Sequence, residues 1–79
     1  MNTYAQLDAA REHLGWSYED LWVAYYRVGG DYAPRDVEAW LNGQSRPSLH
    51  DYDLVACALN ERFADRGIEG CRVPYSGDV

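Results

Sequence analysis

The stretch VEAWLNGQSRPSL, residues 37–49, determines how the rest of this chain is interpreted. It places Val37, Trp40 and Leu41 at helical spacing, and a glycine then ends that helix. The residues that follow are polar and carry a single arginine, which is typical of an exposed turn. Ser48 can cap a further helix, because its hydroxyl can accept a backbone N–H of the first turn. The stretch therefore predicts the end of one short helix, an exposed polar turn and the start of another helix.

Similar sequence signals mark the outer ends of the two helices that meet at this turn. Pro34 suits the first position of the short helix, since the N–H that proline lacks would have no partner there. The helix after Ser48 is expected to run to Gly67. Its expected inner face is a long apolar stripe, which comprises Leu49, Tyr52, Val55, Ala56, Leu59 and Phe63.

Two earlier helices are predicted nearer the N-terminus. Thr3 and Gln6 have the spacing of a capping box, and Gly15 is the expected end of the helix that follows. Ser17 is expected to cap a second helix, which Gly29-Gly30 ends. Helical spacing predicts the inner faces of these two helices, which comprise Leu7, Ala10 and Leu14 in the first and Leu21, Ala24, Tyr25 and Val28 in the second.

The C-terminal residues 68–79 show no apolar periodicity and contain Gly, Pro and Gly. We expect this tail to be irregular, with Ile68 or Val73 folded back on the helices. The sequence therefore predicts an all-α fold, a compact bundle of four main helices. Residues 1–67 form the expected domain.

Composition limits the classes of function. The 79 residues allow one domain with a small core, and 47% hydrophobic with 25% charged residues is typical of a globular chain. The net charge of −6 argues against a nucleic-acid partner, because phosphate contacts favour basic domains. The charge is uneven, however: residues 33–50 have zero net charge, whereas residues 1–32 and 51–79 each carry −3.

No pattern for catalysis, metal binding or cofactor binding is present. His13 and His50 are isolated, and Cys57 and Cys71 do not combine with them at zinc spacing. We expect Cys57 to be a small buried hydrophobe. No apolar run approaches ~18 residues and the N-terminus lacks a signal-peptide pattern, so we expect a cytosolic protein that is not an enzyme and has no membrane partner.

Several segments between Leu14 and Arg66 resemble the Cro-type, lambda-repressor-like helix-turn-helix family, also called XRE. LGWSYEDL (14–21) resembles the entry to its second helix, and VEAWLNGQSRPSL the end of its recognition helix. LHDYDLVACALN (49–60) resembles the core helix that follows, and ALNERFADRG (58–67) is similar to small helix-turn-helix proteins of actinobacterial phages. The resemblance implies a phage-encoded transcriptional regulator in the cytoplasm of a bacterial host cell. Such a protein binds double-stranded operator DNA, and we expect a dimer on half-sites about one helical turn apart.

The spacing between the second and third helices departs from the family. Leu21 and Trp40 are 19 positions apart, and the family spacing is roughly five shorter. The additional residues must lengthen the second helix or enlarge the loop GGDYAP (29–34). The expected fold is therefore a helix-turn-helix with an enlarged turn.

The resemblance also implies which residues contact DNA. The recognition helix points its N-terminal end into the major groove, where Arg35 can donate two hydrogen bonds to guanine and Ala39 can meet a thymine methyl. Asp36 and Glu38 oppose this use unless they pair with Arg35 or lie off the groove. The expected phosphate contacts are Gln44, Ser45 and Arg46 in the turn, Ser48 at the following helix, and Ser17 and Tyr18 at the second helix.

A second interpretation is an acidic protein-binding module on the same scaffold, which docks a host or phage protein and does not bind DNA. Surface aromatics can form such an interface, or the contact of a homodimer. The candidates are Trp16, Trp22, Tyr26 and Tyr32. Trp22 follows the inward-facing Leu21, so it can alternatively belong to a second core face.

Overall fold

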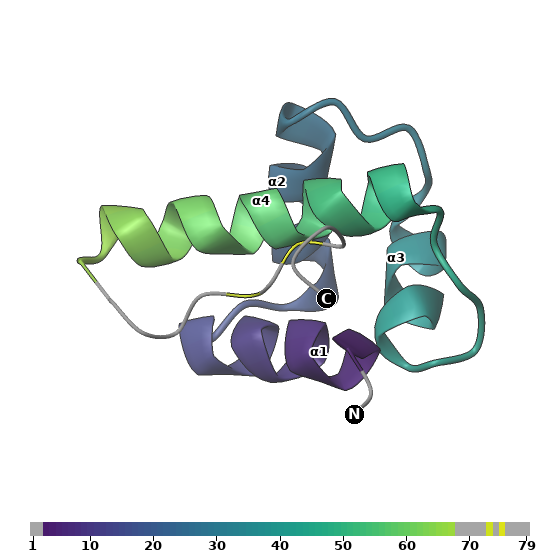
Figure 1. Cartoon of the computed structure of the whole chain (residues 1–79), viewed down its shortest axis with the longest axis horizontal. Coiled ribbons are helices and arrows are strands. Elements are labelled where there is room, and N and C mark those ends of the chain that lie inside the picture. The colour runs from purple at the N-terminus through teal and green to yellow at the C-terminus, as the bar shows by residue number, and fades with distance from the viewer. Residues whose placement is uncertain (1–2, 68–72, 74, 76–79) are drawn as a thin grey trace.

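A computed structural model describes residues 3–67, 73 and 75 of the chain. The elements follow the order α1 (Thr3–Leu14), α2 (Tyr18–Arg27), α3 (Pro34–Leu41) and α4 (Leu49–Asp65), as shown in Figure 1. The described residues contain these helices and no strand, so the predicted all-α fold is confirmed. No helix in this part of the chain is both long and apolar enough to span a membrane.

The helix boundaries follow the capping signals in the sequence. Ser17 Oγ accepts the Asp20 N–H at 3.1 Å, and the Asp20 carboxylate accepts the Ser17 N–H at 3.0 Å. Pro34 is the first residue of α3, and Ser48 caps α4. One boundary differs: α1 begins at Thr3 itself, so Thr3 is not the residue that precedes the helix.

The core is formed by the expected stripes of all four helices. Each helix contributes a core side chain that is at most 1% exposed; these are Leu7, Leu21, Val37 and Leu59. Leu49 is a wrong prediction, because its side chain is 73% exposed. It is the first residue of α4, and helix side chains lean toward the N-terminus, so this side chain extends past the end of the core.

The C-terminal tail packs back on the helices at Val73. This side chain is 3% exposed, its N–H donates to Asn60 Oδ1 at 2.7 Å, and its carbonyl accepts from Asn60 Nδ2 at 2.9 Å. The expected return of Val73 to the core is confirmed. Ile68 and Cys71 lie outside the described residues.

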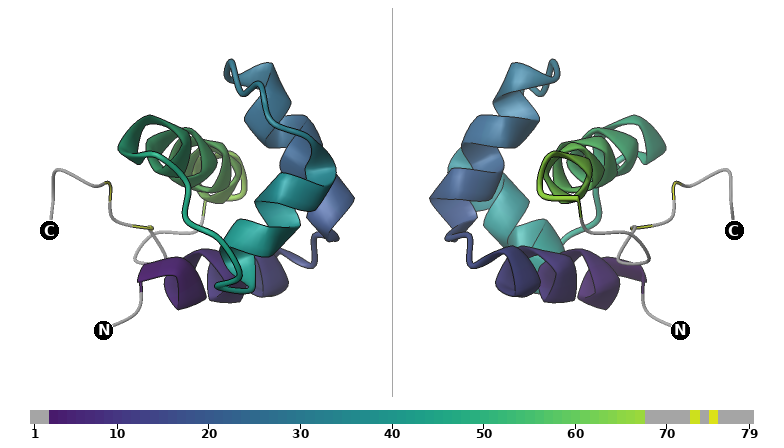
Figure 2. Two further views of the ribbon diagram at one scale, coloured as in Figure 1. Left: turned by 90° about the vertical axis from the view of Figure 1, so that its right-hand side faces the viewer. Right: turned by 90° about the vertical axis from the view of Figure 1, so that its left-hand side faces the viewer.

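The connection between α2 and α3 consists of residues 28–33, because α2 ends at Arg27 and α3 begins at Pro34. Figure 2 shows this connection returning alongside α2 before α3 begins. The fully buried Tyr25 holds it in place: its hydroxyl accepts the backbone N–H groups of Asp31 and Tyr32, both at 3.3 Å. Gly30 packs so tightly on this ring that any Cβ at position 30 would collide with Tyr25.

Candidate nucleic-acid interface

The residues expected to contact DNA are distributed over α3, the turn 42–48 and two helix N-termini. The α3 helix, this turn and the start of α4 share one side of the molecule, which faces the viewer in the left panel of Figure 2. The exposed members of the set are Ser17, Arg35, Gln44, Ser45, Arg46 and Ser48, whereas Tyr18 and Ala39 are half-buried.

Arg35 lies on the exposed face of α3, opposite the buried Val37. Within the described residues it forms no ion pair, so neither Asp36 nor Glu38 neutralises it. Asp36 instead accepts the Ala33 N–H at 3.1 Å and thereby caps the N-terminus of α3. Glu38 is exposed one turn after Arg35 and places a negative charge on the same face.

Tyr18 joins the start of α2 to the end of α3. Its hydroxyl donates to Asn42 Oδ1 at 3.1 Å, and the Arg11 guanidinium lies 4.2 Å above its ring. Asn42 directly follows α3, seven positions after Arg35, or roughly 10 Å further along the helix axis. The structure therefore places Ser17 and Tyr18 beside the C-terminal end of α3 and not beside Arg35.

Asn42 did not emerge from the sequence as a site residue. It is exposed and belongs to the same face of α3 as Arg35, and its side-chain oxygen is occupied by the Tyr18 hydroxyl. Its amide NH2 group can donate to a phosphate or a base edge. The sequence signal for this role was weak, because an Asn before a Gly at a helix end is also a common way to end a helix.

The N-terminus of α4 already holds a carboxylate. Asp51 is 7% exposed, and it accepts hydrogen bonds from the Ser48 hydroxyl at 2.8 Å and the Tyr25 hydroxyl at 2.9 Å. Ser48 Oγ also accepts the Asp51 N–H at 3.1 Å. A phosphate that approached Ser48 would meet the negative charge of Asp51. Ser48 thus acts as a helix cap first.

In the turn after α3, side chains are more available for phosphate contacts than backbone N–H groups are. The N–H groups of Gln44 and Ser45 both donate to the Ala39 carbonyl, at 2.9 and 3.4 Å. The side chains of Gln44, Ser45 and Arg46 are exposed, and Arg46 forms no ion pair within the described residues. Phosphate contacts from this turn would therefore come from three side chains.

The surface aromatics occupy a different region: Trp16 lies just before α2, and the others lie on α2 and the connection that follows it. Tyr26 is 62% and Tyr32 51% exposed, while Trp16 and Trp22 are half-buried against the core. Trp22 packs on Tyr26 with ring centroids 5.4 Å apart, and its indole N–H donates to the Tyr32 carbonyl at 2.8 Å. Trp22 thus packs against the edge of the core and stays partly exposed, and its role in an interface remains a prediction.

Two titratable side chains, Cys57 and Tyr25, have raised pKa values. Cys57 is half-buried, and burial together with the nearby Glu61 carboxylate raises the pKa of its thiol, which keeps the thiol protonated. Burial also raises the pKa of the Tyr25 hydroxyl, and its hydrogen bond to Asp51 adds to the effect. No group of three or more His, Cys, Asp or Glu side chains converges there as metal ligands do.

Comparisons of the chain with family models, curated proteins and solved structures gave no match.

Proposed function

We propose that this chain is a small sequence-specific DNA-binding transcriptional regulator of the Cro or repressor type. It is encoded by a phage, acts in the cytoplasm of a bacterial host cell, and reads the major groove with α3. The observation that carries the proposal is a pair of exposed arginines, Arg35 at the start of α3 and Arg46 in the turn after it. Neither is neutralised by an ion pair within the described residues.

Each part of this surface has a distinct role in the proposal. Arg35 donates to guanine O6 and N7, a contact worth ~1–3 kcal/mol of discrimination, and Ala39 meets a thymine methyl. Gln44, Ser45 and Arg46 contact phosphates through their side chains, which fixes the position of α3 in the groove. Residues 33–50 carry no net charge, so DNA repels this surface less than it repels the acidic segments on either side.

The test is binding of the purified protein to a pool of randomised duplexes, measured by fluorescence anisotropy at ~50 mM salt, where phosphate contacts are strongest. We expect Arg35→Ala and Arg46→Ala each to weaken binding. Arg66→Ala is the matched control, since Arg66 is an exposed arginine at the far end of α4 from α3 (Figure 1). Equal affinity of all four proteins would reject α3 and its turn as the binding surface.

Selection of preferred sequences from the duplex pool then distinguishes the role of Arg35 from that of Arg46. Arg35→Ala is expected to relax the preference at one base position, because Arg35 contacts a base edge. Arg46→Ala is expected to weaken all sequences about equally, because a phosphate contact carries no sequence information. Identical sequence profiles for the wild type and Arg35→Ala would contradict the role of Arg35.

The second candidate function is an acidic protein-binding module that does not bind DNA. The specific observation in its favour is the exposure of Tyr26 and Tyr32 on an acidic domain, since tyrosine is enriched in protein interfaces. Salt discriminates between the two candidates: DNA binding weakens steeply as salt rises, whereas a largely apolar protein contact changes little.

A further inference from the structure

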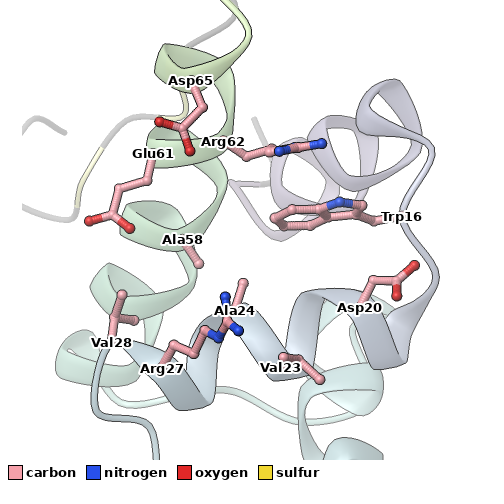
Figure 3. Close-up of a pocket in the computed structure, with 10 residues that line it drawn as sticks. All are labelled: Trp16, Asp20, Val23, Ala24, Arg27, Val28, Ala58, Glu61, Arg62 and Asp65. Carbon is pink, nitrogen blue, oxygen red and sulfur yellow. The ribbon is translucent and has the colours of Figure 1, made fainter.

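An open groove of about 440 Å³ separates α2 from the C-terminal half of α4 (Figure 3). Its apolar lining consists of Val23, Ala24 and Val28 on the α2 side and Ala58 on the α4 side. The two alanines leave the groove open, because larger side chains at these positions would occupy the space between the helices. Small-molecule sites in proteins typically have volumes of ~300–1,000 Å³. The groove is therefore large enough to hold the apolar side chain of a small ligand.

Charged side chains of both signs also line this groove. They are three acids and two arginines, namely Asp20, Glu61, Asp65, Arg27 and Arg62. None of them forms an ion pair within the described residues, where both ion pairs belong to Arg11. Opposite charges that face one groove without pairing can each find a partner in a ligand that carries both signs.

The backbone of Trp16 is held in place at one end of the groove. Its carbonyl accepts a hydrogen bond from the Arg11 guanidinium at 2.6 Å, and its N–H donates to the Arg11 carbonyl at 3.1 Å. Figure 3 shows its indole between Arg62 on the α4 side and Asp20 on the α2 side. Asp20 uses Oδ2 for the Ser17 N–H, and its other carboxylate oxygen can accept a further donor. This end of the groove thus presents a cation, an anion and an aromatic ring together.

We propose that this groove binds a free α-amino acid with an apolar side chain. The carboxylate of the amino acid pairs with Arg62, and its ammonium group lies between the Asp20 carboxylate and the face of the Trp16 indole. Its side chain lies along Ala24 and Ala58. A ligand with only one of the two charges would leave either Arg62 or Asp20 without its partner, so the site selects the zwitterion.

The opposite end of the groove does not compete for the charged groups of the ligand. Arg27 and Glu61 stand there, away from Trp16 (Figure 3), and their opposite charges together favour neither sign. The charged side chains are all exposed, so solvent screens them and the dissociation constant should be on the order of 1 mM. The groove shares no residue with α3 or the turn after it, so this proposal is independent of the proposed DNA contacts.

The probe is L-phenylalanine, titrated into the isotope-labelled full chain to ~20 mM, well above the expected dissociation constant, and followed by nuclear magnetic resonance. We expect the signals of Trp16, Ala24 and Ala58 to move with a single dissociation constant. Phenethylamine lacks the carboxylate and phenylpropionate lacks the ammonium group, and each should bind at least about tenfold more weakly. Unchanged signals with L-phenylalanine, or equal binding of either analogue, would overturn the proposal.

Two substitutions test which residue meets which charge. Arg62→Gln should weaken L-phenylalanine binding about tenfold and should not weaken phenethylamine, which has no carboxylate. Asp20→Asn keeps an acceptor for the Ser17 N–H, and it should weaken L-phenylalanine but not phenylpropionate. Arg66→Gln and Glu19→Gln are the matched controls outside the groove and should bind like the wild type. Circular dichroism establishes that each variant is folded. Substitutions in the groove that bind L-phenylalanine as tightly as their controls would also overturn the proposal.

Discussion

The two connections on either side of α3 have similar lengths and opposite character. Residues 28–33, before α3, are held by the buried ring of Tyr25 and by the backbone contacts of its hydroxyl. Residues 42–48, after α3, expose the side chains of Gln44, Ser45 and Arg46. The difference teaches that the connection before α3 is anchored to the core through Gly30 and Tyr25, whereas the exposed side chains of the turn after α3 are free to meet a ligand. Changes in the first should alter stability, and changes in the second should alter binding.

The largest expected effect is that of Gly30→Ala. The new methyl group would collide with the Tyr25 ring, and overpacking of this kind costs ~1–3 kcal/mol or more. The measurement is the free energy of unfolding in urea. Gly43→Ala is the matched control, because no atom lies near its added methyl and only its φ of +76° is unfavourable. Equal losses for both variants would show that the first connection is not tightly packed.

The next effect is that of Tyr25→Phe, which removes the hydroxyl and keeps the ring. Asp51 would lose a donor, and the N–H groups of Asp31 and Tyr32 would lose their acceptor. We expect a loss of ~1–3 kcal/mol in the free energy of unfolding, since buried polar groups are left without a partner. A loss below ~0.5 kcal/mol would indicate that water replaces these hydrogen bonds at little cost.

The same tyrosine predicts a response to alkaline pH. The pKa of Tyr25 is raised above its ordinary value of 10.0, so folding favours the protonated hydroxyl. This contribution is complete below pH 10 and is lost as the pH rises through the folded-state pKa. The fall in unfolding free energy above pH 10 should therefore be smaller in Tyr25→Phe than in the wild type. Parallel curves for the two proteins would contradict this assignment.

A smaller effect is expected for Ser48→Ala at the end of the second connection. The change removes the cap of α4 and a hydrogen bond to Asp51, and loss of such a cap typically costs ~1 kcal/mol. A urea titration measures this loss. Ser48→Asp should lower the free energy of unfolding more than Ser48→Asn does. Both residues can cap the helix, but the aspartate repels Asp51. The reverse order would contradict the repulsion expected between the new carboxylate and Asp51.

The smallest effect on stability is expected for Arg46→Ala, within ~0.5 kcal/mol, because exposed residues without partners contribute little. Its effect on DNA affinity should nevertheless exceed that of Gly43→Ala, which leaves every side chain of the turn in place. If Arg46→Ala were destabilised but bound DNA normally, the turn after α3 would contribute to stability and not to binding, which would contradict the account.

Local chemistry made most of the helix pattern predictable. Ser17, Pro34 and Ser48 mark helix starts through bonds within their own first turns, so no tertiary information is needed. Leu49 was mispredicted because its exposure depends on where the core ends. That position is set by the packing of other helices.

The arrangement of the site depended on contacts distant in sequence. Tyr25 meets Asp51 from 26 positions away, and Tyr18 meets Asn42 from 24 positions away. No local pattern specifies either pair. The exposure of Arg35 followed from the helical period and was predictable. That the Tyr25 hydroxyl holds the Asp51 carboxylate at the start of α4 was not.

The most direct test of the proposed function is a salt titration of wild-type binding to the randomised duplex pool. Two to four phosphate contacts predict that log K falls with log salt concentration with a slope of about −2 to −4. Such a slope, lowered by about one in Arg46→Ala, is the expected result. Absence of binding even at ~50 mM salt, or a slope near zero, would contradict DNA recognition by α3 and favour the protein-binding module.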